Sequence, residues 1–239
     1  MARAKAHTAW TVLPHQPIER LSDRLWRVEG SLPGMPLRRV MTIARRDDGG
    51  LVIHNAIAVD DAARAAIEAW GPIAVIVVPN AYHRLDARVF HDRYPAARVI
   101  CPAGARARVE QVVPVTGTYD DTPGDAAVAL QTLDGTAAGE GVMIVQGGDG
   151  ASLVFNDIVF NMPHQGGFTG FVLRWIVASS GGPRVSRIGR WFLARDKPAL
   201  RGHLERLAGT PGLRRIVVSH HQVIDRDPAR VLRDVAATL

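Results

Sequence analysis

The sequence has one cysteine, two lysines and no apolar run long enough to cross a membrane. Cys101 has no partner for an internal disulfide, and we expect it to be a small apolar residue of a strand at 97–101 rather than a catalytic thiol. The longest apolar runs, near 74–78 and 171–178, fall far short of the ~20 residues of a membrane span. The N-terminus also lacks the apolar core of a secretory signal. We therefore expect a cytoplasmic protein without a membrane partner.

Lysine is scarce, and arginine supplies nearly all of the positive charge. Lys5 and Lys197 are the only lysines among 29 basic residues, and the formal net charge is +6. A basic surface can attract polyanions. These arginines, however, are scattered and are not interleaved with the aromatic side chains that stack on single-stranded bases. The charge therefore indicates a compositional preference for arginine, and we expect a small-molecule substrate or ligand rather than nucleic acid.

Several common signatures are also missing. The chain has no phosphate-binding glycine loop, no Gly-x-Ser-x-Gly elbow and no Cys-x-x-Cys pair. No repeat of fixed period and no low-complexity linker divides its 239 residues, of which 47% are hydrophobic. This length and composition suffice for one large core. We expect a single domain over residues 1–239, with residues 1–20 as a candidate extended arm.

Strand and helix patterns alternate along the chain, which indicates an α/β protein with sheets covered by helices. In the first half, a meander of three short strands is followed by helix, strand, helix and strand at 25–30, 38–45, 51–56, 61–70, 73–80, 84–94 and 97–102. The first helix begins at Asp60 or Asp61. In the second half, strands are predicted at 126–133, 141–146, 152–160 and 214–221. Helices are predicted after Asp196 and Asp227, each followed by a proline near the first turn.

This order of elements resembles the metallo-β-lactamase fold, a four-layer αββα sandwich. The resemblance covers roughly residues 20–239 and is carried by "LVIHNAIAVDDAARAAIEAWGPIAVIVVPN", by the strand "LVFNDIVF" and by the late strand "RRIVVSHHQVI". In that family, the strand corresponding to "IVVPN" is followed by His-x-His-x-Asp-His, and later strands end in an aspartate and a histidine. Those side chains hold one or two zinc ions. The resemblance is to a divergent branch of the superfamily.

The metal motif is degenerate in this chain. Read without a gap, Asn80 falls on the first histidine position of the family, and that register leaves no ligand. A loop shorter by two residues keeps one histidine, His83. The family's middle histidine has no equivalent, and Glu140 is the only nearby acid that could replace it. Asp157 and His220 match the family's bridging aspartate and its last histidine.

The resemblance and the strand-end positions make His83, Asp157 and His220 the candidate metal ligands, with His83 and Asp157 as the candidate catalytic residues. Catalytic zinc takes three such ligands and leaves a fourth position for a water whose pKa falls toward ~7. Ligands for a second metal are missing, so we expect a mononuclear site with one zinc, or iron or manganese in its place. His54 or Asp86 could orient the ligands from outside.

Each candidate also has an explanation without a metal. His83 could cap the nearby helix, and a buried Asp157 could be satisfied by an arginine or a helix N-terminus. We expect His54 to be a hydrogen-bonded core or edge histidine rather than a ligand. His220 and His221 are adjacent on a strand, so at most one of them faces the site. Two hypotheses remain: a metal-dependent hydrolase acting on an ester, thioester or amide, and a metal-free binding or scaffolding protein.

The segment 164–182 carries an amphipathic stripe bounded by glycines. Its apolar members are Phe168, Phe171, Val172, Trp175 and Ile176. We rank a core helix first among its interpretations, ahead of a lid over the site and a homodimer contact.

Overall fold

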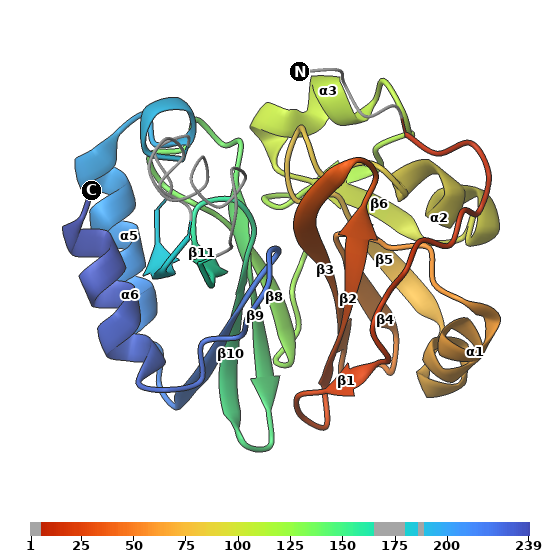
Figure 1. The fold of residues 1–239 in the computed structure, drawn as a ribbon, viewed down its shortest axis with the longest axis horizontal. Helices are drawn as coiled ribbons and strands as arrows, with labels where there is room; N and C mark the ends of the chain where they lie inside the picture. The colour runs from red at the N-terminus through yellow and green to blue at the C-terminus, as the bar shows by residue number, and fades with distance from the viewer. Residues whose placement is uncertain (1–5, 165–179, 186–188) are drawn as a thin grey trace.

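Two β-sheets lie face to face, and helices cover the outer side of each (Figure 1). The computed structural model describes residues 6–164, 180–185 and 189–239. The first sheet has the strand order β1-β2-β3-β4-β5-β6-β7, the second has the order β13-β10-β9-β8, and β11 pairs with β12 apart from both. None of the described helices has the length and hydropathy that a membrane crossing requires.

The first half of the chain builds the larger sheet and its helices. Its strands are β1 (Glu19–Arg20), β2 (Leu25–Leu32), β3 (Met35–Arg45), β4 (Leu51–His54), β5 (Ile73–Val77), β6 (Arg98–Cys101) and β7 (Gly117–Thr118). Its helices are α1 (Asp61–Trp70), α2 (Ala87–Arg93), a 3-10 turn at Ala103–Ala105 and α3 (Arg106–Val109). Strands β2, β3 and β4 are antiparallel, whereas β4 to β7 are parallel. The predicted meander and the strand–helix–strand unit are confirmed.

The second half builds the smaller sheet. Its strands are β8 (Val128–Thr132), β9 (Gly141–Gly147), β10 (Gly150–Phe155) and β13 (Leu213–Val218), with the separate pair β11 (Phe160–Met162) and β12 (Gly182–Arg184). A π-helical turn (Gly189–Leu193) precedes α5 (Lys197–Ala208), and α6 (Pro228–Ala237) follows β13. Strands β8, β9 and β10 are antiparallel, as predicted, and β13 runs parallel to β10.

Three helices are capped by aspartate side chains, because an aspartate oxygen can accept a hydrogen bond from an otherwise unpaired N–H group of the first turn. Asp60 accepts from the backbone N–H of Ala63 at 2.8 Å, so Asp60 rather than Asp61 caps α1. Asp196 and Asp227 cap α5 and α6 in the same way. Both of these helices have a proline in the first turn, as expected.

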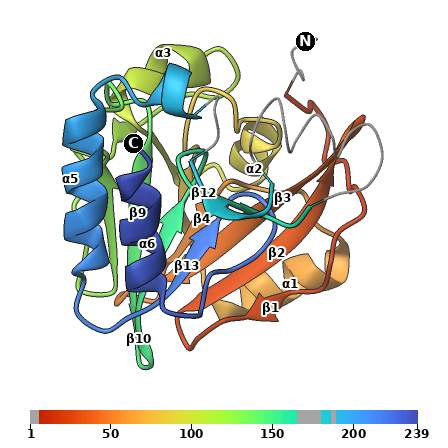
Figure 2. The same ribbon diagram turned by 60° about the vertical axis from the view of Figure 1, so that its left-hand side comes forward.

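Three clusters of buried apolar side chains separate the layers. The first lies between the larger sheet and the helices α1 and α2, and the second lies between the smaller sheet and α5 and α6. The third lies between the two sheets. Strand β4 shows why all three form: Ile53 points to the helices and Val52 points to the other sheet, because successive side chains of a strand face opposite ways. The predicted four-layer αββα sandwich is confirmed (Figure 2).

The register of the parallel strands brings distant polar residues to one edge. Phe155 of β10 lies opposite Val218 of β13, and both strands end there. The single strand predicted at 152–160 is wrong, because β10 ends at Phe155 and β11 begins only at Phe160. Between them, the backbone N–H of Asp157 donates to Glu140 Oε2 at 3.4 Å instead of to a neighbouring strand.

Candidate metal centre

His83, Asp157 and His220 meet at the carboxyl ends of strands from both sheets. Each offers one ligand atom, and these atoms all lie within 4.8 Å of one another. The Nε2 atoms of His83 and His220 lie 3.0 and 3.2 Å from Oδ1 of Asp157. Asp157 and His220 each follow the end of a parallel strand by two residues, so the register of β10 and β13 sets them side by side. His83 reaches them from the loop that follows β5.

The Nδ1 atoms of both histidines are already engaged. His220 Nδ1 lies 2.7 Å from the carbonyl oxygen of Arg38, which can only accept, so Nδ1 carries the proton. His83 Nδ1 lies 3.2 Å from Oδ1 of Asn55. The amide group of Asn55 is oriented because its Nδ2 donates to the carbonyl oxygen of Val40 at 2.8 Å. Both imidazoles therefore turn Nε2 toward Asp157, and in the neutral form of each ring that nitrogen carries a lone pair.

This arrangement fits a metal ion. Two nitrogen lone pairs and a carboxylate oxygen repel one another at 3.0–3.2 Å unless protons or a cation lie between them. A tetrahedral zinc with bonds of 2.0–2.2 Å separates its ligand atoms by about 3.3–3.6 Å. The two nitrogen–oxygen distances of 3.0 and 3.2 Å approach this within a few tenths of an ångström, and all three ligand atoms lie within 4.8 Å of one another. Histidines that ligate metals also commonly donate their other N–H group to a carbonyl or carboxylate oxygen. The three side chains could therefore hold one ion and leave a fourth position open.

The pKa values of two acidic side chains in this region are shifted in opposite directions. Burial raises the pKa of Asp157, but the positive charges that His83 and His220 carry when protonated, together with their hydrogen bonds, outweigh burial and hold that pKa well below its usual range. Burial, and then the negative charge of Asp157, raise the pKa of Glu140 well above its usual range. The pair therefore favours an ionised Asp157 beside a neutral Glu140.

Asn80 connects these two acids. Its Nδ2 lies 2.6 Å from Oε1 of Glu140 and 2.7 Å from Oδ2 of Asp157. Its Oδ1 accepts the backbone N–H groups of Tyr82 and His83 at 2.8 and 3.0 Å. The side-chain amide of Asn80 thus makes all four of the hydrogen bonds available to it, and the residue is 1% exposed.

The two residues expected to orient the ligands from outside do not have that role. Asp86 forms ion pairs with His7 and Arg39, and its contacts do not include the site histidines. His54 is fully buried beside the site, yet among the described residues neither of its ring nitrogens has a hydrogen-bond partner. The expectation of a hydrogen-bonded core histidine is therefore wrong as well. Burial, and then the charge of His83, lower the pKa of His54 to about 3.

The rings of His83 and His220 both face the site. His83 does not cap α2, because the residue at the start of that helix is Asp86 and the ring of His83 is engaged by Asn55 and Asp157. Next to His220, His221 adopts a positive φ of 67° as the chain turns away, and burial followed by the charge of His220 lowers its pKa to about 4. The stripe predicted within 164–182 lies at residues 168–176, outside the described residues.

Sequence reasoning missed Asn55 as the residue that orients His83, and it assigned Asn80 no role. Each is the first polar side chain after a buried strand end, in "LVIHN" and "VVPN". Asn55 also has a positive φ of 58°, a conformation that asparagine tolerates better than most residues. Their position just after a buried strand is therefore the sequence feature that could have identified Asn55 and Asn80 as site residues.

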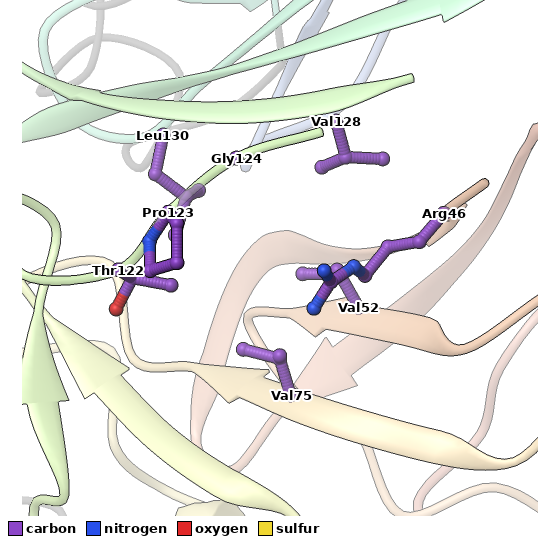
Figure 3. Close-up of a pocket in the computed structure, with 8 residues that line it drawn as sticks. All are labelled: Arg46, Val52, Val75, Thr122, Pro123, Gly124, Val128 and Leu130. Carbon is purple, nitrogen blue, oxygen red and sulfur yellow. The ribbon is translucent and has the colours of Figure 1, made fainter. Parts of the chain in front are cut away.

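A cavity elsewhere between the sheets offers no comparable chemistry. It has a volume of about 20 Å³ and lies near the beginnings of β4 and β5 (Figure 3), lined by Arg46, Val52, Val75, Thr122, Pro123, Gly124, Val128 and Leu130. Arg46 is paired with Asp125 at 3.1 Å. A space of this size holds about one water molecule, so it is too small for a substrate.

Comparison with known proteins identifies the fold. No protein-family model matches the chain, and no curated protein matches its sequence. Solved structures do match. The metallo-β-lactamase DIM-1 superposes with a TM-score of 0.63 at 13% identity, over 95% of this chain and 99% of that one. FIM-1 from Pseudomonas aeruginosa, in a mono-zinc form, gives a TM-score of 0.61 at 12% identity, over 95% and 96%.

A metallo-β-lactamase from Hirschia baltica gives a TM-score of 0.60 at 13% identity, over 92% of this chain and 98% of that one. Matches at this level of identity reflect shared architecture. The chain therefore has the metallo-β-lactamase fold.

Proposed function

We propose that this chain is a metal-dependent hydrolase with a mononuclear site, in which His83, Asp157 and His220 hold the ion. The observation that carries the proposal is geometric: both Nδ1 atoms are engaged by oxygen acceptors, while both Nε2 atoms lie 3.0–3.2 Å from one oxygen of Asp157. Zinc suits two imidazole nitrogens and a carboxylate oxygen, and iron or manganese could take its place. When bound, the ion would polarise a carbonyl group and lower the pKa of a water molecule at the open position.

The residues around the ligands have supporting roles in this proposal. The Arg38 carbonyl and the Asn55 amide fix the two rings, so the ligand nitrogens are oriented before an ion arrives. Phe160 stacks parallel to His220, with ring centroids 5.2 Å apart, and shields that ring from water. The side chains of His83 and Asp157 are 12% and 16% exposed, which leaves them accessible from solution.

The substrate class follows from the chemistry of such a site. Attack by an activated water suits an acyl carbon, so the expected substrate is a small ester, thioester or amide. The matching structures are named as metallo-β-lactamases, and a β-lactam is a cyclic amide. FIM-1 is described in a mono-zinc form, which is consistent with one ion in this fold.

Metal analysis tests the proposal. Protein expressed with added zinc, iron or manganese should contain about one ion per chain, because sites of this type bind tightly. Asp157→Asn should weaken zinc binding by at least about 100-fold, at or beyond the upper end of what loss of an outer-shell partner costs. The matched control is Asp149→Asn, at the β9–β10 turn, where the aspartate pairs with Arg215.

Hydrolysis provides the second measurement. A chromogenic β-lactam, an aryl ester and a thioester form a suitable panel, and turnover of at least one should vanish with a chelator and return with zinc. Less than about 0.2 ions per chain after supplementation would contradict the proposal. That result would favour the metal-free binding protein, with protonated histidines paired to Asp157.

A further inference from the structure

The Asn80 amide group lies between two buried carboxyl groups that approach each other from different elements. Glu140 comes from the loop before β9, and Asp157 follows β10. A single nitrogen, Asn80 Nδ2, is within 2.7 Å of an oxygen of each. Two ionised carboxyl groups this close need a proton or a positive group between them, because their charges repel.

The orientation of Asn80 follows from its other contacts. The backbone N–H groups of Tyr82 and His83 both donate to Oδ1, and an N–H donor cannot face the NH₂ end of the amide. The NH₂ end is therefore fixed toward Glu140 and Asp157. Its two hydrogens, each carrying partial positive charge, point one to each acid.

We propose that the Asn80 amide occupies the position where a second cation would otherwise bridge Glu140 and Asp157, which limits the site to one metal ion. Asn80 is then a positioning residue: it holds Oδ2 of Asp157 and leaves Oδ1 to face the two histidines. This inference rests on the proposed function, because it concerns the same site. It adds a structural reason for a single ion and predicts how a second binding position can be created.

The substitution Asn80→Asp converts this blocking group into a ligand. The retained oxygen can still accept the backbone N–H groups of Tyr82 and His83, while the other oxygen joins Glu140 and Asp157 as a third carboxylate ligand for a cation. Three carboxyl groups then converge on one point. Oxygen sets of this kind suit hard divalent cations such as manganese.

The experiment adds Mn²⁺ to zinc-loaded protein and counts both metals by mass spectrometry of the intact chain, with electron paramagnetic resonance of the bound manganese. Wild type should keep one zinc and gain no manganese. Asn80→Asp should gain one Mn²⁺ per chain. The matched control, Asn161→Asp, adds the same charge in β11, where the asparagine donates to the Gln222 carbonyl oxygen, and should gain none.

A second variant separates the two roles proposed for Asn80, which are to position Asp157 and to exclude a second cation. Asn80→Leu removes the NH₂ group without adding a ligand, so it should gain no Mn²⁺ but should bind zinc about 10–100-fold more weakly, as expected when a ligand loses its outer partner. Circular dichroism and thermal unfolding establish that each variant is folded.

The outcomes distinguish the two proposals. A folded Asn80→Asp variant that binds one zinc and no manganese overturns the inference and leaves the proposed function standing. Two metals in wild type, or a manganese gain in Asn161→Asp equal to that in Asn80→Asp, overturns the inference as well. A wild type that binds no metal overturns both.

Discussion

Two aspartates, Asp86 at the start of α2 and Asp157 just after β10, have side chains with little or no exposure, yet their surroundings differ. The Asp86 side chain is 0% exposed, and its oxygens lie 2.6 Å from His7 Nδ1, 2.6 Å from Arg39 Nη2 and 3.1 Å from the backbone nitrogen of Ala58. The Asp157 side chain is 16% exposed and contacts two histidines and an asparagine. Both carboxylates have several partners, but only one of them is accessible.

The difference lies in the chemistry of the partners. Arg39 is permanently charged, so Asp86 is neutralised whatever the solution contains. The histidines at Asp157 carry no charge in their neutral form and then present nitrogen lone pairs. The negative charge of Asp157 is then compensated only when protons or a cation are added. A largely buried carboxylate therefore indicates a functional site only when its partners leave its charge uncompensated.

The largest expected effect is on stability, from Asp86→Asn. It leaves the buried Arg39 without its counter-charge, which should lower the free energy of unfolding by about 3–5 kcal/mol, measured by urea denaturation. The metal content of the folded variant should not change. The control Asp234→Asn breaks an exposed pair with Arg230 and should cost no more than about 1 kcal/mol. A variant that loses metal and keeps its stability would reverse the roles assigned to the two aspartates.

An intermediate effect is expected on metal affinity, from Asn55→Gly. Glycine accepts the φ of 58° without strain but cannot hold the Nδ1 proton of His83. Zinc binding, measured by competition with a chromogenic chelator, should weaken about 10–100-fold. Asn55→Ala should show the same loss together with a backbone cost of about 1–2 kcal/mol. Unchanged zinc affinity in the glycine variant would show that Asn55 does not support zinc binding by orienting His83.

The smallest effect concerns the pH dependence of stability in chelator-treated protein. The pKa of His54 is lowered from 6.5 to about 3 in the folded chain, so below pH 6.5 the unfolded chain binds the extra proton and stability falls as the pH falls. His54→Leu should reduce the slope between pH 6 and 4 by about 1.4 kcal/mol per pH unit, the value for one proton. His221 stays acid-sensitive, because its pKa is lowered to about 4. Identical slopes for variant and wild type would show that His54 does not titrate as described.

Much of the fold could be predicted, because its signals are local. The alternation of Val52 and Ile53 identifies a strand covered on both faces, and Asp60 and Asp227 mark helix starts. The break after Phe155 was missed, since the apolar pattern continues to residue 160 while the chain turns.

The site could be predicted only in part. The resemblance to the metallo-β-lactamase fold and the strand-end positions suggested His83, Asp157 and His220, and the structure brings them together, while their role as ligands stays a prediction. The supports could not be predicted. The partner of His220 is the backbone carbonyl group of Arg38, which has no side-chain signature. One partner of Asp86, His7, lies 79 residues earlier in the chain.

The parallel register of β10 and β13 has a further consequence. It fixes Asp157 and His220 on the sheet made by the second half of the chain, whereas His83 belongs to the sheet made by the first half. An ion bound by all three side chains would link the two sheets at one end of their interface. When the free ion concentration is 100 times the dissociation constant, binding adds about 2.7 kcal/mol to the free energy of unfolding. Binding of the ion and packing of the two sheets against each other would therefore be coupled.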